Sequence, residues 1–189
     1  MSGRNNGKIR QCYTTCDVTV TGSKAGGISG TNESPSSSSA IIQSCYATGK
    51  IIGNGEVGGI LGCDYQTNDQ VEWCVAMNSE VTARTGTAVG RILGYKSGIL
   101  TNNNYARSTG MTVKSNNVTL TTLTPTPSFS NIHGESVTAA NTHGANSATW
   151  WTTAVGFTNE NWSLAANRLP HLKTTTSGAF NQTQTPTVN

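Results

Sequence analysis

The acidic residues that could act in catalysis or bind a metal lie close together in one segment of this chain. Asp64, Asp69 and Glu72 all fall within residues 64–72, a stretch without lysine or arginine. A glycosidase holds two carboxyl groups about 5–9.5 Å apart on a rigid frame, and a calcium loop supplies oxygen ligands at regular spacing. Residues 64–72 lack the D-x-D-x-D-G order and read as an insertion, so we expect a solvated acidic loop.

The histidines and the sequence motifs of known enzyme classes give no stronger candidate. His133, His143 and His171 are separated by ten residues or more, and no cluster of acids and thiols accompanies them. The sequence contains no G-x-S-x-G elbow, no H-E-x-x-H motif and no P-loop. We therefore expect a protein that is not an enzyme, with no catalytic, cofactor-binding or metal-binding residues.

A repeat organises the first part of the chain and predicts its fold. Three copies end in a glycine-rich unit, and the closing residues Gly30, Gly62 and Gly94 lie 32 residues apart (62 − 30 and 94 − 62). A fixed period of roughly 20–50 residues is the signature of stacked supersecondary units. Within each copy, short segments such as residues 17–21 alternate apolar and polar side chains, which is typical of β-strands.

These features predict an all-β fold, a β-helix (β-solenoid) of about three to four rungs with a Trp-rich C-terminal cap. Equivalent apolar residues of successive copies would stack inside it. The residues expected in this structural core ladder are Ile9, Cys12, Val18, Ile28, Ile42, Cys45, Ile51, Ile60, Val71, Cys74, Val81 and Ile92.

Three of the five cysteines occupy the same place in the repeat. Stacked rungs bring equivalent Cα atoms to about 4.8 Å, but parallel side chains keep their Cβ atoms farther apart than a disulfide allows. We expect Cys12, Cys45 and Cys74 to be reduced thiols that behave as small apolar side chains. Cys16 and Cys63 have no equivalents in the other copies, so any disulfide would involve one of them.

The composition changes after about residue 113, and we expect three further segments there. Bulky apolar residues gather late in the chain, where they would plug the open end of the solenoid; a sugar-stacking platform is the alternative. The expected divisions are a solenoid at 1–113 (repeats at about 3–29, 30–61, 62–93 and 94–113), a Thr/Pro-rich connector at 114–145, a cap at 146–173 and a flexible tail at 174–189. The expected cap residues are Trp150, Trp151, Phe157, Trp162, Leu164, Leu169 and Leu172.

The charge pattern excludes two classes of partner. The net charge is +3 and charged residues make up 11% of the chain, without a cluster of lysines and arginines, so we expect no nucleic-acid partner. No window approaches the ~18 apolar residues of a spanning helix, so we expect no membrane insertion of this segment. Met1 falls inside a repeat, which suggests upstream repeats or domains of a longer native chain.

The repeat unit, G-x-N-x-G-x-I-x-x-C-Y-A-x-G-x-V followed by V-G-G-I-x-G, resembles the GLUG repeat of bacterial surface proteins. The resemblance covers residues 3–173 and is carried by units such as Cys45-Tyr46-Ala47 and Val57-Gly58-Gly59-Ile60. Members of that family are similar to large secreted or outer-membrane-attached proteins, including adhesins and repeat regions beside extracellular peptidase domains. The resemblance implies an extracellular or cell-surface location and the carboxy-terminal end of an array.

Two functions are consistent with this sequence. The first is a non-catalytic cell-surface or secreted repeat module, an adhesin or spacer that binds host or matrix glycan or protein. The alternative is an accessory domain of an extracellular carbohydrate-active enzyme or peptidase. Insertions in a solenoid map to loops on one side, often the binding side. The candidate contact residues in the inserted loops are Asn32, Glu33, Asp64, Tyr65 and Asp69.

Overall fold

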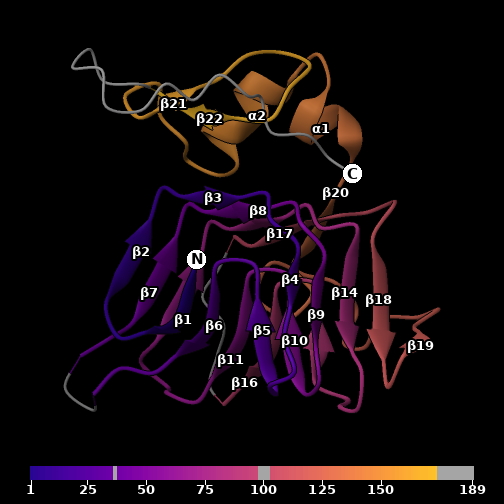
Figure 1. Ribbon diagram of the computed structural model, residues 1–189. Coiled ribbons are helices and arrows are strands. Elements are labelled where there is room, and N and C mark those ends of the chain that lie inside the picture. Colours follow the sequence, from indigo (N-terminus) through magenta and orange to yellow (C-terminus); the bar gives the residue numbers. More distant parts are fainter. Residues whose placement is uncertain (36–37, 98–102, 174–189) are drawn as a thin grey trace.

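The computed structural model describes residues 1–35, 38–97 and 103–173, and these form a β-solenoid with a small C-terminal unit on one side. Figure 1 shows short strands stacked coil upon coil, with the helices outside the stack. The predicted all-β solenoid fold is therefore confirmed. The tail predicted at residues 174–189 lies outside the described residues.

Each of the first three coils contains five short strands. The first comprises β1 (Ser2–Asn5), β2 (Lys8–Arg10), β3 (Tyr13–Thr14), β4 (Val18–Thr19) and β5 (Lys24–Gly26). The second comprises β6 (Ser29–Asn32), β7 (Ile41–Gln43), β8 (Tyr46–Ala47), β9 (Ile51–Gly53) and β10 (Glu56–Gly58). The third comprises β11 (Leu61–Asp64), β12 (Gln70–Glu72), β13 (Val75–Ala76), β14 (Glu80–Ala83) and β15 (Val89–Gly90).

The fourth coil is irregular and leads into the C-terminal unit. It contains β16 (Leu93–Lys96), β17 (Tyr105–Arg107) and β18 (Thr112–Ser115), followed by β19 (Val118–Thr119) and β20 (Glu135–Val137). The C-terminal unit contains α1 (Ala139–His143), α2 (Ser147–Thr153), β21 (Trp162–Ser163) and β22 (His171–Leu172).

Equivalent strands pair side by side, so the solenoid wall consists of five sheets. Their strand orders are β1-β6-β11-β16, β2-β7-β12, β3-β8-β13-β17-β20, β4-β9-β14-β18-β19 and β5-β10-β15. All pairs in these sheets are parallel except β18 with β19, which form an antiparallel hairpin. The inner face of these sheets packs on the core of the solenoid, which suits the β-branched residues of the repeat.

The strand register follows the repeat. Ile42 pairs with Ile9 on one side and with Val71 on the other, and Ile60 donates its backbone N–H to the carbonyl of Ile92 at 2.9 Å. In the second and third coils the ladder residues are completely buried. These fully buried ladder residues are Ile42, Cys45, Ile51, Ile60, Val71, Cys74, Val81 and Ile92, and Ile28 of the first coil is 1% exposed.

The first coil departs from the expected burial. We expected Ile9, Cys12 and Val18 to be buried, but each is only partly buried. Strands β1 to β5 are the outermost members of their sheets, so their side chains are covered by neighbours from one direction alone. Stacking on both sides is what excludes water from the middle coils.

One corner of every coil uses a left-handed backbone conformation. Each residue there lies directly before the cysteine position of the ladder, which Asn104 takes over in the fourth coil. The residues with positive φ at this corner are Gln11 (51°), Ser44 (53°), Trp73 (57°) and Asn103 (68°). Such a φ is uncommon for any residue except glycine and asparagine, so the stacked geometry of the coils overrides local preference there.

The segment predicted as a connector at 114–145 is partly solenoid, which corrects that division of the chain. Strand β20 continues the sheet of β17 in parallel, and the backbone of Ile132 accepts a hydrogen bond from Ile92 N at 2.9 Å. Ile132 therefore extends the Ile28/Ile60/Ile92 stack, and Leu120 and Leu123 pack against another part of the core. Thr and Pro suggested a linker, but these apolar side chains cover the end of the solenoid.

The C-terminal unit covers a side of the solenoid instead of plugging its end, which corrects the predicted position of the cap. Its aromatic cluster packs on Tyr13, Tyr46, Val75 and Tyr105, which belong to four successive coils of one sheet. Figure 1 shows α2, β21 and β22 above β3, β8 and β17. The unit shields the outward-facing aromatic residues of that sheet from water. The end of the solenoid is already covered, because Leu120, Leu123 and Ile132 pack against the core there.

Candidate functional site

Two of the three acids in segment 64–72 are buried in the solenoid, although the loop between them is exposed at Tyr65, Thr67 and Asn68. Asp64 lies in β11 and is completely buried, and its Oδ2 lies 2.7 Å from Nζ of Lys96, whose side chain is 2% exposed. Burial raises the pKa of Asp64, and the hydrogen bond and charge of Lys96 oppose that shift. This ion pair is structural, since neither group is accessible to a ligand.

The second acid, Asp69, holds two loops together. Its carboxylate accepts hydrogen bonds from the Ser34 hydroxyl at 2.5 Å and from the Ala40 backbone N–H at 2.7 Å. Because Asp69 is 1% exposed, it binds the inserted loop of the preceding coil and is not available as a base or a metal ligand. The third acid, Glu72, is partly buried and accepts a hydrogen bond from Gln43 Nε2 at 2.6 Å.

Three of the five predicted contact residues are therefore wrong: Asn32, Asp64 and Asp69 are all buried. Asn32 stacks between Asn5 and Asp64 in a polar ladder inside the wall, and it accepts a hydrogen bond from Asn5 Nδ2 at 3.0 Å. Glu33 does lie at the surface, 3.2 Å from Arg4. Tyr65 is the fifth residue, and it is exposed.

Tyr65 belongs to an aromatic pair on the outer surface, which we call the Tyr65/Tyr95 platform. The two ring centroids are 5.6 Å apart with an interplanar angle of 50°, and the residues are 42% and 40% exposed. The Tyr65 hydroxyl donates to Glu56 Oε1 at 2.6 Å, and Lys24 Nζ lies 4.4 Å from the ring centroid. Sequence reasoning missed Tyr95, although it pairs with Cys63 across β11 and β16.

Cys63 lies beneath this platform and is completely buried. Its burial raises the pKa of the thiol to about 12, partly offset by a hydrogen bond with Tyr65. A thiol with this pKa is almost entirely protonated at neutral pH and is a poor nucleophile. Cys63 therefore contributes a neighbour to both tyrosines, through its pairing with Tyr95 and its hydrogen bond with Tyr65, and not a nucleophile.

The cysteines of the ladder are free thiols, and so are Cys16 and Cys63. The hydrogen bond between Cys12 and Cys45 and the burial of Cys12 raise the pKa of Cys12. The Sγ atoms donate to backbone carbonyls, such as Cys74 Sγ to the Glu72 carbonyl at 3.3 Å. The ladder thus acts in packing.

The histidines lie apart and serve structural roles. His133 is 1% exposed; its Nδ1 accepts from Arg91 N at 3.4 Å and its Nε2 lies 3.2 Å from the Thr124 carbonyl. His143 and His171 are partly buried in the C-terminal unit, and burial lowers the pKa of all three. Within residues 1–35, 38–97 and 103–173, no three His, Cys, Asp or Glu side chains converge to hold a metal.

The expected cap residues form a single cluster. Trp151, Phe157, Trp162 and Leu169 are buried, with the rings of Phe157 and Trp162 stacked at 4.2 Å. Trp150, Leu164 and Leu172 are only partly buried at the edge of the cluster. The tryptophans contact Tyr46 and Tyr105 of the solenoid and do not form an open sugar-stacking surface. No helix in the described part of the chain is long and apolar enough to cross a membrane.

Comparison with known proteins supports the fold but shows no family. No protein-family model matches the chain, and no curated protein matches it. A crystal structure from Bacteroides ovatus, named "putative immunoglobulin A1 protease", is similar with a TM-score of 0.59 and 23% sequence identity. The match covers 88% of this chain and 57% of that one, so this chain spans little more than half of its relative. At this identity the likeness shows a shared fold alone.

Proposed function

We propose that this chain is a non-catalytic β-solenoid module of a cell-surface or secreted bacterial protein, acting in adhesion or as a stiff spacer. The observation that carries the proposal is that the acidic residues of segment 64–72 make structural contacts. Asp64 is paired with Lys96 and Asp69 holds the inserted loop, so the residues best placed in sequence for catalysis are occupied by structural contacts. What the molecule offers a partner is the outer surface of a rigid stack of sheets.

The GLUG resemblance supports an extracellular or cell-surface location for this module, in an array with upstream repeats. The partner would be a host or matrix glycan or protein.

An accessory role beside an extracellular peptidase is the second candidate. One observation favours it: the similar structure from Bacteroides ovatus bears the name "putative immunoglobulin A1 protease" and extends well beyond the matched region. Under this proposal the solenoid would position a substrate or the cell surface for a catalytic domain elsewhere. A carbohydrate-active enzyme would use an accessory module in the same way.

Two measurements on the purified chain test these proposals. Incubation with immunoglobulin A1 and with casein, followed by mass spectrometry, should show no cleavage; new peptides would overturn the non-catalytic assignment. An array of immobilised glycans and extracellular-matrix proteins should show saturable binding to at least one probe. Absence of binding at high probe density would remove adhesion and leave the spacer role.

A further inference from the structure

We propose that the Tyr65/Tyr95 platform is a carbohydrate-binding site that stacks a neutral pyranose ring. This inference rests on the proposed function of the chain as a surface-binding module and names its ligand class. It uses Tyr65 and Tyr95 with two polar neighbours, Lys24 and Glu56.

The first argument is that the fold does not need these rings at the surface. Most tyrosines and all tryptophans of the described chain contribute to the cluster between the solenoid and its C-terminal unit. Tyr65 and Tyr95 instead remain 42% and 40% exposed. Single exposed aromatics are ordinary, but these two lie on neighbouring coils with their ring centroids 5.6 Å apart, so they offer a ligand one shared aromatic surface.

The second argument is that the rings are fixed before any ligand binds. Glu56 accepts a hydrogen bond from the Tyr65 hydroxyl at 2.6 Å, Lys24 lies against the Tyr65 ring, and Ser97 Oγ donates to the Tyr65 carbonyl at 2.7 Å. The pairing of β16 with β11 holds the backbone of Tyr95, and its ring lies against that of Tyr65. Rigid aromatic side chains lose little conformational entropy on binding, which is why they dominate recognition surfaces.

The position of Glu56 also indicates that the platform is more than packing. Its second carboxylate oxygen, Oε2, is buried and has no hydrogen-bond partner among the described residues. A buried acceptor without a donor lowers stability, so the fold alone gains little from a glutamate here. Glu56 does orient the Tyr65 hydroxyl, and that orientation benefits a bound ligand.

The chemistry of the patch favours a sugar over other ligands. The face of an aromatic ring carries partial negative charge and attracts the polarised C–H groups of a pyranose. Lys24 Nζ already lies over one face of the Tyr65 ring, so the sugar would stack on the exposed part of the tyrosine pair that Lys24 does not cover. Lys24 and the tyrosine hydroxyls can bond the sugar hydroxyls. One lysine beside one glutamate does not provide the basic surface that nucleic acid requires. The near-neutral pair also favours an uncharged sugar over an acidic one.

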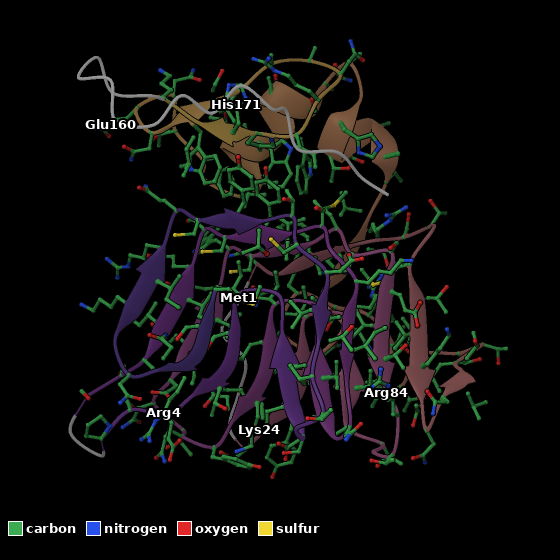
Figure 2. All side chains as sticks on the ribbon, viewed as in Figure 1. Met1, Arg4, Lys24, Arg84, Glu160 and His171 are labelled. Carbon is green, nitrogen blue, oxygen red and sulfur yellow. The ribbon has the colours of Figure 1, made fainter. Side chains whose placement is uncertain are left out.

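The platform is independent of the C-terminal unit. In Figure 2, Lys24 lies on the side of the solenoid opposite the unit that carries Glu160 and His171. A ligand at the platform therefore needs no rearrangement of the aromatic cluster, and substitutions there leave that cluster intact.

The test uses the whole chain and four named probes: cellohexaose, chitohexaose, mannohexaose and lacto-N-tetraose. Ligand-observed NMR and calorimetry should detect binding of at least one probe, with a loss of about tenfold or more in affinity for Tyr65→Ala and for Tyr95→Ala. Phe129→Ala is the matched control, because Phe129 is 43% exposed and does not adjoin the platform tyrosines. The Phe129→Ala variant should bind the probe with the same affinity as the wild type.

Three outcomes would overturn the proposal. In the first, none of the four probes binds. In the second, the wild type and both tyrosine variants bind a probe with equal affinity. In the third, light scattering shows a dimer that Tyr95→Ala dissociates, which would make the platform a contact between two copies of the chain. Glu56→Gln keeps the shape of the side chain and should weaken binding less than Tyr65→Ala. If no sugar probe binds while array binding to a matrix protein survives Tyr65→Ala/Tyr95→Ala, the sugar site fails and the proposed module function stands.

Discussion

Arg91 occupies the position in the third coil that Gly59 holds in the second, and the two are joined by a hydrogen bond from Gly59 N to the Arg91 carbonyl at 3.1 Å. A Cβ on Gly59 would collide with that carbonyl oxygen, so the second coil admits only glycine. Arg91 is 4% exposed and extends into the irregular end of the solenoid. Its guanidinium donates to the carbonyls of His133, Gly134 and Arg107 and to Ser136 Oγ.

Replacement of Arg91 should therefore destabilise the end of the solenoid. Arg91→Ala leaves the buried carbonyls of His133 and Gly134 without this donor, which costs about 1–3 kcal/mol each. Burial lowers the pKa of Arg91 to about 10, so the charge persists at neutral pH. Urea unfolding measures the effect, and Arg10→Ala, at an exposed position of the first coil, is the control. Equal stability of the two variants would show that Arg91 does not hold this end.

The middle coils should be more sensitive to substitution than the first. Ile60→Ala removes a completely buried side chain and should lower the free energy of unfolding by about 2–5 kcal/mol. Ile9→Ala makes the same change where the side chain is already partly exposed, so its effect should be clearly smaller. Chemical denaturation of both variants decides the matter, and a larger loss for Ile9→Ala would contradict the stacked core.

The repeat predicts the solenoid well because stacking is a property of spacing. Once the coils form with this period, Ile28, Ile60 and Ile92 stack in register, and the insertions between them become loops. The burial of Asp64 depends instead on its ion pair with Lys96, and Lys96 lies beside Asp64 only after the coils have stacked in register. For the same reason the sequence pattern of residues 64–72 suggested a solvated loop where the structure has a buried ion pair.

The position of the C-terminal unit was equally hidden in the sequence. Tyr13, Tyr46 and Tyr105 each follow the cysteine position, or its replacement Asn104, and the expected alternation places them outside the coil. Had these outward aromatics been read as one stripe along the solenoid, they would have indicated a surface that needs covering. Trp73, with a φ of 57°, could not have been anticipated, because a bulky side chain rarely adopts this conformation.

Acidification should destabilise the protein partly through His133. Burial lowers the pKa of His133 in the folded state below its unfolded value, so the unfolded chain binds the proton more readily. Its contribution to stability is complete above the unfolded pKa of about 6.5 and is lost as the pH falls toward the folded pKa. Melting temperatures between pH 7.5 and 5 should decline less for His133→Gln than for the wild type. Burial raises the pKa of Asp64, and comparing the two chains cancels that contribution because both contain Asp64. Parallel curves of melting temperature against pH would show that His133 does not contribute to the acid sensitivity.

Thiol reactivity should separate the exposed cysteine from the buried ones. Cys16 is exposed, Cys12 is partly buried, and Cys45, Cys63 and Cys74 are buried. Under native conditions an aromatic disulfide reagent should label Cys16 rapidly and the three buried thiols only after urea is added, since the thiolate must reach solvent to react. Intact mass without reductant should correspond to five free thiols. A mapped bridge between Cys12 and Cys45 would contradict the ladder geometry.

Removal of the C-terminal unit should expose an aromatic side of the solenoid, not its end. A chain ending at Val137 keeps β20 and Ile132, and so keeps the end cover, but loses the partners of Tyr13, Tyr46 and Tyr105. We expect this fragment to bind a hydrophobic dye and to aggregate, because burial of large aromatic side chains contributes about 1.5–3 kcal/mol each. Truncation after Lys173 removes no residue of the aromatic cluster and should leave the melting temperature unchanged.

Truncation after Pro125 should lower solubility more than either of the other two truncations, since it also removes Ile132 and β20. A soluble, cooperatively folding 1–137 fragment would show that the C-terminal unit is dispensable for the solenoid, and the stripe of tyrosines would then be a second candidate surface for a ligand.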